Sequence, residues 1–337
     1  MTTDAPRKRR RLWLGSALLC ALAVVAGLTV ATNTNALGPR ELCDGWLSSE
    51  DARQGLGGQG RVTSSSAFPS ECTLEQTGWL PGSDDAKVRL VISTNRADDP
   101  FVDSGWTVSG DRLIVSGAFP GAFDTYGNGW VSLPASCSRL GDRAITGGPV
   151  VLRTLVERSV SDPVKLSRMA ERAARAIAGA HNCRPASGST AGAARYLPAS
   201  PLTKTDPAKV CGLPGFALAA AAPAGTPVQE QTSGSRDDAW FCDLSLDEPG
   251  DVRKRTDRSG TFARLAIIQN PALFPAARER EFERAVCGGK ETYFAMDSLS
   301  FEWRTRDPKD EAARTFFQKS LIWDRFPKAA RTSLGCE

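Results

Sequence analysis

Eight of the nine cysteines in this 337-residue chain fall into two series with similar spacing. The first series is Cys43, Cys72, Cys137 and Cys183, and the second is Cys211, Cys242, Cys287 and Cys336. Successive separations are 29, 65 and 46 residues in the first series and 31, 45 and 49 residues in the second. Because crosslinks between such cysteines would limit the conformations open to the chain, this spacing constrains the fold strongly. It predicts one structural unit used twice.

The residues that flank the cysteines support this internal repeat. Residues 41–43 and 209–211 each place an apolar residue and a cysteine at the start of a unit. The second cysteine of each series opens an alternating, strand-like run. Near the end of each unit, Asp162-Pro163 and Asp307-Pro308 precede a helical pattern that ends at the last cysteine. Aspartate as N-cap with proline at the first helical position favours a helix start.

The N-terminal region predicts where the chain matures. Residues 7–11 are all basic, and residues 12–31 carry no charge. Twenty residues of helix are about 30 Å long, which matches the hydrocarbon core of a bilayer. Because basic flanks stay on the cytoplasmic side, we expect a single-pass transmembrane helix with the N-terminus inside and the bulk of the chain outside.

Other export signals remain alternatives to this anchor. Residues 34–36 form an acceptable cleavage site for a secretory signal, although the apolar stretch is long for such a signal. The pair Arg10-Arg11 resembles a twin-arginine export signal. Cys20 lacks the small preceding residue of a lipoprotein signal, so we interpret it as a thiol within the apolar segment. All of these alternatives place the later cysteines outside the cytoplasm.

The net charge gives no support to nucleic-acid binding. The chain holds 42 basic and 38 acidic residues, a formal net charge of +4. Residues 1–11 carry five of the basic residues and one of the acidic residues, which leaves 37 of each in the remainder. The remainder is therefore neutral, whereas nucleic-acid-binding domains are usually basic.

An even number of cysteines in an oxidising compartment predicts disulfide bonds. Four cysteines in a unit allow three pairings, and we favour consecutive pairs because each would tie a terminal helix to a neighbouring strand. The expected pairs are Cys43–Cys72, Cys137–Cys183, Cys211–Cys242 and Cys287–Cys336. Zinc sites usually need closely spaced cysteines, and no two cysteines are close here, so we expect no metal.

These patterns predict an α+β fold: a single N-terminal transmembrane helix followed by two related disulfide-bonded domains, each an antiparallel sheet with helices packed on it. Short strands are expected at 72–79, 87–95, 106–115, 150–158, 240–247, 262–270, 291–298 and 300–304, and helices after Ser48, over 162–180, near 276–285 and after Pro308. The expected segments are a basic tail (1–11), the membrane helix (12–31), a stalk (32–40), unit 1 (41–184), a linker (185–207) and unit 2 (208–337).

A glycine- and aromatic-rich stretch, residues 117–130, is the candidate ligand loop. The first unit has 20 more residues than the second between its second and third cysteines, and this stretch accounts for the excess. Aromatic side chains on such a loop can bind a glycan or a peptide, or can cover a small core of their own. The candidate ligand residues are Trp106, Phe119, Phe123, Tyr126 and Trp130.

Other motifs predict no catalytic, cofactor or metal site. Gly55, Gly57 and Gly60 match Gly-x-Gly-x-x-Gly, but a dinucleotide loop follows a strand, and these glycines follow a predicted helix. The acidic run 98–103 contains a proline and is interpreted as a turn rather than as a metal-binding helix. His181, the single histidine, lies in the last turn of a predicted helix, where a cation suits the helix dipole.

The opening of unit 1, residues 43–52 with Cys72 about thirty residues later, resembles actinobacterial exported or lipoprotein-like cell-envelope domains of unknown function. The resemblance implies an extracytoplasmic location and a disulfide bond, and it transfers no catalytic residue. We therefore expect a non-enzymatic binding or structural role outside the membrane, with an envelope protein or glycan as partner. An envelope hydrolase with a carboxylate pair is the alternative.

Overall fold

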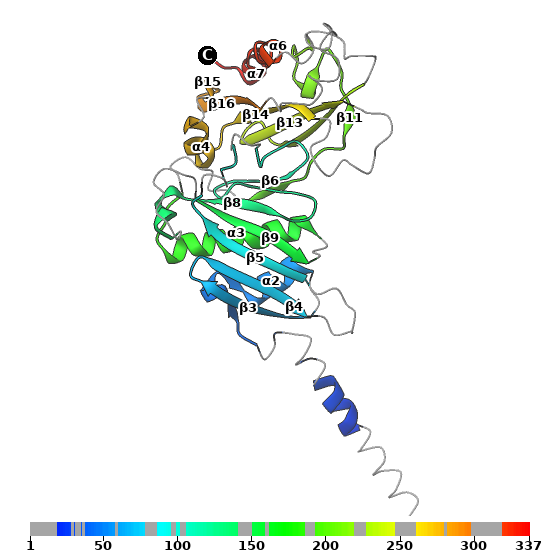
Figure 1. Cartoon of the computed structure of the whole chain (residues 1–337), viewed down its shortest axis with the longest axis vertical. Helices are drawn as coiled ribbons and strands as arrows, with labels where there is room; N and C mark the ends of the chain where they lie inside the picture. Colours follow the sequence, from blue (N-terminus) through cyan, green and yellow to red (C-terminus); the bar gives the residue numbers. More distant parts are fainter. Residues whose placement is uncertain are drawn as a thin grey trace, which may run out of the picture.

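The chain is described from a computed structural model, whose overall arrangement is shown in Figure 1. The structure describes residues 19–27, 30, 35, 38–57, 60–77, 86–95, 99–101, 106–140, 150–158, 162–185, 193–218, 227–246, 261–279, 282–297 and 319–337. The statements below concern these residues.

Most of the first half of the chain forms an eight-stranded antiparallel sheet. Its strand order is β10-β6-β7-β8-β9-β5-β4-β3. The strands are β3 (Arg61–Phe68), β4 (Glu71–Thr77), β5 (Ala86–Ser93), β6 (Leu113–Ser116), β7 (Gly121–Phe123), β8 (Gly129–Leu133), β9 (Val150–Arg158) and β10 (Arg195–Leu197). A small two-stranded sheet, β1 (Glu41–Leu42) with β2 (Leu47–Ser48), precedes it.

The second half forms a six-stranded antiparallel sheet in the order β11-β12-β13-β14-β16-β15. The strands are β11 (Thr203–Lys204), β12 (Val228–Gly234), β13 (Ala239–Leu246), β14 (Thr261–Ile268), β15 (Glu283–Cys287) and β16 (Lys290–Asp297). The α-helices are α2 (Ser49–Leu56), α3 (Pro163–Ala180), α4 (Phe274–Glu279), α6 (Lys319–Trp323) and α7 (Phe326–Leu334). The 3₁₀ helices are η2 (Cys43–Gly45), η4 (Ala135–Leu140), η5 (Val210–Gly212) and η7 (Pro271–Leu273).

Each of the two large sheets contains five strands in an equivalent order. The first sheet contains β3-β4-β5-β9-β8 in that order, and the second contains β12-β13-β14-β16-β15. The first sheet adds β7, β6 and β10 beyond β8. The predicted disulfide bonds are present and join consecutive cysteines: Cys43–Cys72, Cys137–Cys183, Cys211–Cys242 and Cys287–Cys336. These four bonds indicate an oxidising, extracytoplasmic environment.

The first cysteine of each series lies in a similar turn. Cys43 and Cys211 both have left-handed backbone conformations, with φ of 56° and 55°. A side chain on the adjacent strand accepts a hydrogen bond from each cysteine N–H: Ser64 Oγ at 3.3 Å for Cys43, and Glu230 Oε2 at 2.7 Å for Cys211. Burial raises the pKa of Glu230. The two acceptors occupy equivalent strand positions, since Glu230 lies opposite Leu244 and Ser64 lies opposite Leu74. The two units therefore hold this strained turn in the same place.

The predicted fold class, α+β behind a transmembrane helix, is wrong. The described chain is mostly sheet, in sheets of eight, six and two strands, with few helices. The aromatic stretch predicted as a loop contributes β7 and β8, because its short apolar runs pair across tight turns. Of the predicted span, residues 12–18, 28–29 and 31 lie outside the described residues, and residues 19–27 and 30 are helical. No helix among the described residues is both long and apolar enough to cross a bilayer.

Several local predictions were confirmed and others were wrong. Ser48 caps α2 by accepting from Asp51 N at 3.0 Å, and Asp162 caps α3 with Pro163 in its first turn. The hairpin expected over 106–115 is absent, since Trp106 to Arg112 form a loop and only β6 follows. The helix expected over 276–285 ends at Glu279, and the chain then forms β15. The strand expected at 300–304 lies outside the described residues.

Each large sheet has a helix-covered face. Helices α2 and α3 cover one face of the first sheet, where buried residues such as Ala52, Leu74 and Leu166 form a single core. On the second sheet, Phe326 and Ala330 of α7 pack against buried residues that include Phe294. Along the strands, alternate side chains point into these two cores, as the period of a β-strand requires.

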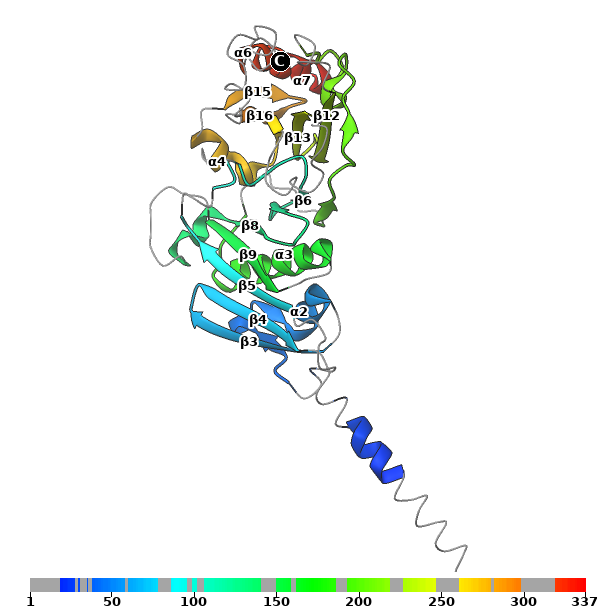
Figure 2. The same ribbon diagram turned by 45° about the vertical axis from the view of Figure 1, so that its right-hand side comes forward.

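The other faces of the two sheets pack against each other and form a third core. The first sheet contributes side chains that alternate with those of its helix-covered face: Ile114, Ala122, Trp130 and Val151. They contact side chains of the second sheet: Phe241, Ala266, Ile268, Tyr293 and Ala295. In both views the second sheet lies beside the β6–β8 end of the first sheet (Figures 1 and 2). The order of layers is therefore helices, sheet, sheet and helix. The space between the units is filled by side chains at this core.

A buried ion pair lies at the edge of the third core. Arg264 and Asp243 are directly opposite on β14 and β13, and their side chains form two hydrogen bonds of 2.8 and 2.9 Å. Asp243 Oδ1 also accepts from Gly110 N at 3.0 Å, and Arg264 Nη1 donates to Trp106 O at 3.1 Å. The Asp243 carboxylate keeps the pKa of Arg264 raised in spite of burial, which alone would lower it. A Cβ at residue 110 would overlap the Gln231 carbonyl oxygen, so glycine permits this close approach.

The segment predicted as a linker adds a strand to each sheet. Of residues 185–207, the structure describes 185 and 193–207. Strand β10 pairs with β6, and β11 pairs with β12. Ser200, between them, donates its N–H to Thr232 O at 2.7 Å. This connection therefore crosses from one sheet to the other and is hydrogen-bonded to both.

Replacing Asp243 by Ala should destabilise the protein strongly. The substitution leaves Arg264 buried without its carboxylate, which costs about 3–5 kcal/mol of unfolding free energy. The double variant Asp243→Leu with Arg264→Met removes both charges and should be less destabilised than the single variant. Denaturant unfolding of the three proteins measures the difference. Glu157→Ala, which removes an exposed partner of Lys87 and Arg89, is the control with an expected cost below about 1 kcal/mol. Equal losses for Asp243→Ala and Glu157→Ala would contradict this role.

Candidate functional site

The structure buries four of the five aromatic residues of the candidate ligand loop. Trp106 and Trp130 belong to the third core, and Phe119 and Phe123 belong to the core under α3; each is at most 5% exposed. Tyr126 alone is exposed, at the tip of the β7–β8 turn. These positions correspond to the alternative interpretation, a segment that covers cores, rather than to an aromatic platform.

The extra residues of the first unit build the contact between the units. Trp106 packs edge-on against Phe101, with ring centroids 5.3 Å apart, and contacts Phe282 of the second half at 5.7 Å. Strands β6 and β7, which have no counterpart in the second sheet, supply Ile114 and Ala122 to the third core. The 20-residue excess is therefore used for docking the sheets.

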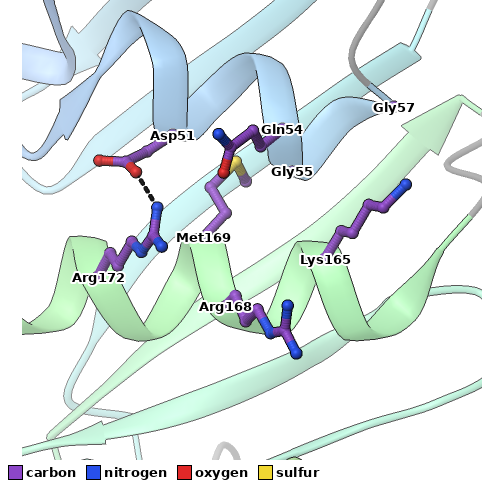
Figure 3. A pocket seen from close by; sticks show the side chains of 8 residues that line it. All are labelled: Asp51, Gln54, Gly55, Gly57, Lys165, Arg168, Met169 and Arg172. Carbon is purple, nitrogen blue, oxygen red and sulfur yellow. Dashed lines mark hydrogen bonds and ion pairs between the residues drawn. The ribbon is translucent and has the colours of Figure 1, made fainter.

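A pocket lies between α2 and α3 and is a candidate site (Figure 3). Gly55 allows the two helices to approach closely, because a Cβ there would lie 2.5 Å from Met169 Sδ. Gly57 ends α2 in a left-handed conformation, with φ of 119°. In the Gly-x-Gly-x-x-Gly match, Gly55 thus packs against α3, Gly57 ends α2, and Gly60 lies against Thr77 O, so these glycines do not open a nucleotide-binding helix.

The pocket between α2 and α3, which we call the α2–α3 pocket, is cationic. It has a volume of about 250 Å³ and is lined by Asp51, Gln54, Gly55, Gly57, Lys165, Arg168, Met169 and Arg172. Figure 3 shows Lys165 and Arg172 extending from α3 toward α2, which carries Asp51 and Gln54, whereas Arg168 extends from α3 away from α2. Three cations against one carboxylate favour the entry of an anionic group.

The three cations differ in their partners. Arg172 forms an ion pair with Asp51 across the helices. Lys165 Nζ lies 3.7 Å from the Asp162 carboxylate, one turn back on α3. Arg168 has no carboxylate partner among the described residues; its guanidinium carbon lies 5.0 Å from the centroid of the Tyr196 ring. The guanidinium of Arg168 therefore lies over Tyr196, on the side of α3 that faces away from α2 (Figure 3).

Tyr196 is a neutral support for Arg168. It lies on β10 at the edge of the first sheet. Burial, together with the nearby Glu171 carboxylate, raises the pKa of Tyr196 to about 12. The ring therefore stays uncharged at neutral pH, and its face can attract the guanidinium by a cation–π interaction.

A second, smaller pocket lies where the two halves meet. It has a volume of about 180 Å³, and Pro134, Pro185 and Pro271 supply rigid walls. Arg184 is the charged residue of its lining. Nothing in this lining supplies a nucleophile with a neighbouring base.

The pockets offer little for catalysis by a carboxylate pair. Asp51 is the single acidic residue among those that line these two pockets, and it is already bound to Arg172. Within the described ranges, no three His, Cys, Asp or Glu side chains converge on a point where a metal ion could bind. Asp99, from the acidic run, is buried and accepts from Phe101 N at 2.8 Å, as in a turn.

Comparison with known proteins found no matching family model, no similar curated protein and no similar solved structure. The resemblance to exported actinobacterial domains stays a prediction. The structure defines a disulfide-bonded protein of two packed β-sheets, with a cationic pocket between two helices and bonds that indicate an extracytoplasmic environment.

The sequence carried a signal for the α2–α3 pocket that motif analysis missed. Lys165, Arg168, Arg172 and Arg175 recur at three- and four-residue steps, so they lie along one exposed stripe of α3. The approach of α2 depends on Gly55 and Met169, which are far apart in sequence.

Replacing Gly55 by Ala should destabilise the protein, although alanine favours helix. The added methyl group meets Met169, and such overpacking costs about 1–3 kcal/mol. Gly179 is the matched control, since it is also the penultimate residue of its helix and has open space around its Cα. There, alanine should stabilise by about 0.5–1 kcal/mol. Thermal unfolding of both variants tests the contact; a Gly55→Ala protein as stable as Gly179→Ala would disprove it.

Proposed function

We propose that this chain is a non-enzymatic binding protein of the extracytoplasmic space, which takes a small ligand or a partner's side chain into the α2–α3 pocket. The observation that carries the proposal is the pocket itself, a concave surface between α2 and α3 that is lined by three basic residues of α3. An envelope protein or glycan is the expected partner class.

The rigidity of the pocket walls supports this role. Helix α2 is fixed by its Ser48 cap and lies between Cys43 and Cys72, which the first disulfide joins. Helix α3 is capped by Asp162 and ends at Ala180, three residues before the disulfide-bonded Cys183. Binding sites on pre-formed elements lose less conformational entropy when a ligand binds.

The distribution of charged groups supports binding rather than catalysis. In the α2–α3 pocket no residue pairs a nucleophile with a base, and no second carboxylate faces Asp51. Recognition needs only complementary shape and charge, which the three cations and the buried Met169 supply.

Fragment screening by NMR on the full, oxidised chain tests the proposal. Fragments should perturb amide signals of residues 51–57 and 165–172, because these line the pocket. Gln54→Trp places a large ring at the pocket and should abolish the perturbations. Arg53→Trp is the matched control, since Arg53 lies beside Gln54 but does not line the pocket.

Two results would contradict the binding role. One is a screen in which no fragment perturbs residues 51–57 or 165–172. The other is binding that Gln54→Trp leaves intact, since a ligand in the α2–α3 pocket must compete with the added ring.

A further inference from the structure

We infer that the side chain of Asn35 blocks the open edge of β3, and that this contact keeps a second copy of the chain from adding its own β3 to the first sheet. The inference is independent of the α2–α3 pocket and of the proposed function. Three observations carry it: the bonds that Asn35 makes, the composition of the edge, and the closure of the outer edge of the second sheet.

Asn35 binds the backbone of β3 as a neighbouring strand would. Its Oδ1 accepts from Val62 N at 2.8 Å, and its Nδ2 donates to Val62 O at 2.8 Å. The peptide groups of an adjacent strand offer the same acceptor and donor to an edge. Asn35 lies 27 residues before Val62 and is not part of a strand. A side-chain amide therefore takes the place of a partner strand.

Strand β3 is the outermost strand of the first sheet, next to β4. Alternate residues of an edge strand direct both backbone groups away from the sheet, so Ser64 shares the outward direction of Val62. Among the described residues, none outside β4 binds the N–H or C=O of Ser64. Beyond Ser65 a register shift interrupts the pairing with β4. The open edge is therefore short, and one amide at Val62 covers a large part of it.

This edge lacks the side chains that usually prevent strand pairing. Residues 62–68 include no proline and no charged residue, whereas edge strands commonly carry one or the other. Thr63 and Ser65 are small and exposed. Two copies of β3 aligned antiparallel about Ser64 place Thr63 of one copy opposite Ser65 of the other, so no like charges meet. Such a pair has the two-fold symmetry that is commonest among dimers.

The outer edge of the second sheet is closed in a comparable way. In β15, Val286 O accepts from Glu337 N at 3.0 Å. The Cys287–Cys336 disulfide holds Glu337 beside this strand. In each large sheet, a residue from outside the sheet thus binds the backbone of an outermost strand, and Asn35 does so for β3.

Sedimentation velocity of the full, oxidised chain tests the inference, with detergent in every sample to cover the exposed apolar residues 19–27. Asn35→Ala should self-associate about tenfold or more strongly than the unmodified chain, because it frees the backbone groups of Val62 for a second β3. Arg40→Ala is the control, since Arg40 is an exposed residue of the same stalk. It should associate no more than the unmodified chain.

Two further measurements assign the association to β3. Adding Thr63→Lys and Ser65→Lys to Asn35→Ala should return association to the level of the unmodified chain, because lysines would then face each other across the paired strands. Hydrogen exchange of Asn35→Ala should show the Ser64 amide at least tenfold slower in the associated form than in the monomer, because the second β3 accepts its hydrogen bond.

Three results would overturn the inference. They are an Asn35→Ala protein that associates no more than Arg40→Ala, association that the two lysines leave unchanged, and an associated form in which the Ser64 amide exchanges as fast as in the monomer. The last two would assign the association to another surface, such as residues 19–27, and would leave Asn35 without a role in blocking β3.

Discussion

The packing of one β-sheet on the other is the interaction on which the rest of this structure depends. Trp130 and Ile114 from the first sheet and Phe241 and Ile268 from the second are buried together, and burial of each such side chain contributes about 1.5–3 kcal/mol. Because both sheets also have a helix-covered face, their strands near the contact are buried on both sides. The two units are therefore packed together through a continuous apolar core.

Polar groups fix the way in which the sheets meet. Apolar contact alone tolerates sliding, whereas the bond from Gly110 N to Asp243 and the bond from Arg264 to Trp106 O each require one register. Asn270 adds a third, by donating to Gly117 O at 2.9 Å. All three join the loops around β6, the part that the first unit has in excess, to the second sheet. The α2–α3 pocket lies on the opposite, helix-covered side of the first sheet, away from this contact.

Sequence reasoning succeeded where a local rule decides the outcome. The consecutive disulfide pairing that the sequence favoured among three was confirmed, and the residues before α2 and α3 marked the helix starts through their capping side chains. It failed where burial comes from distant residues. Arg264 lies in a strand that the sequence predicts, but its burial and its bonds to Asp243 and to Trp106 O depend on the first sheet. The balance of sheet over helix and the pocket beside Arg168 likewise depend on contacts that no local pattern encodes.

Native-state hydrogen exchange at increasing denaturant tests most directly whether the two sheets form one cooperative body. The account predicts that amides of β4 and β5 in the first sheet and of β13 and β14 in the second lose protection together, at the denaturant concentration of global unfolding. Opening of β13 and β14 at a lower concentration, while β4 and β5 remain protected, would show that the sheets are independent and would contradict the account.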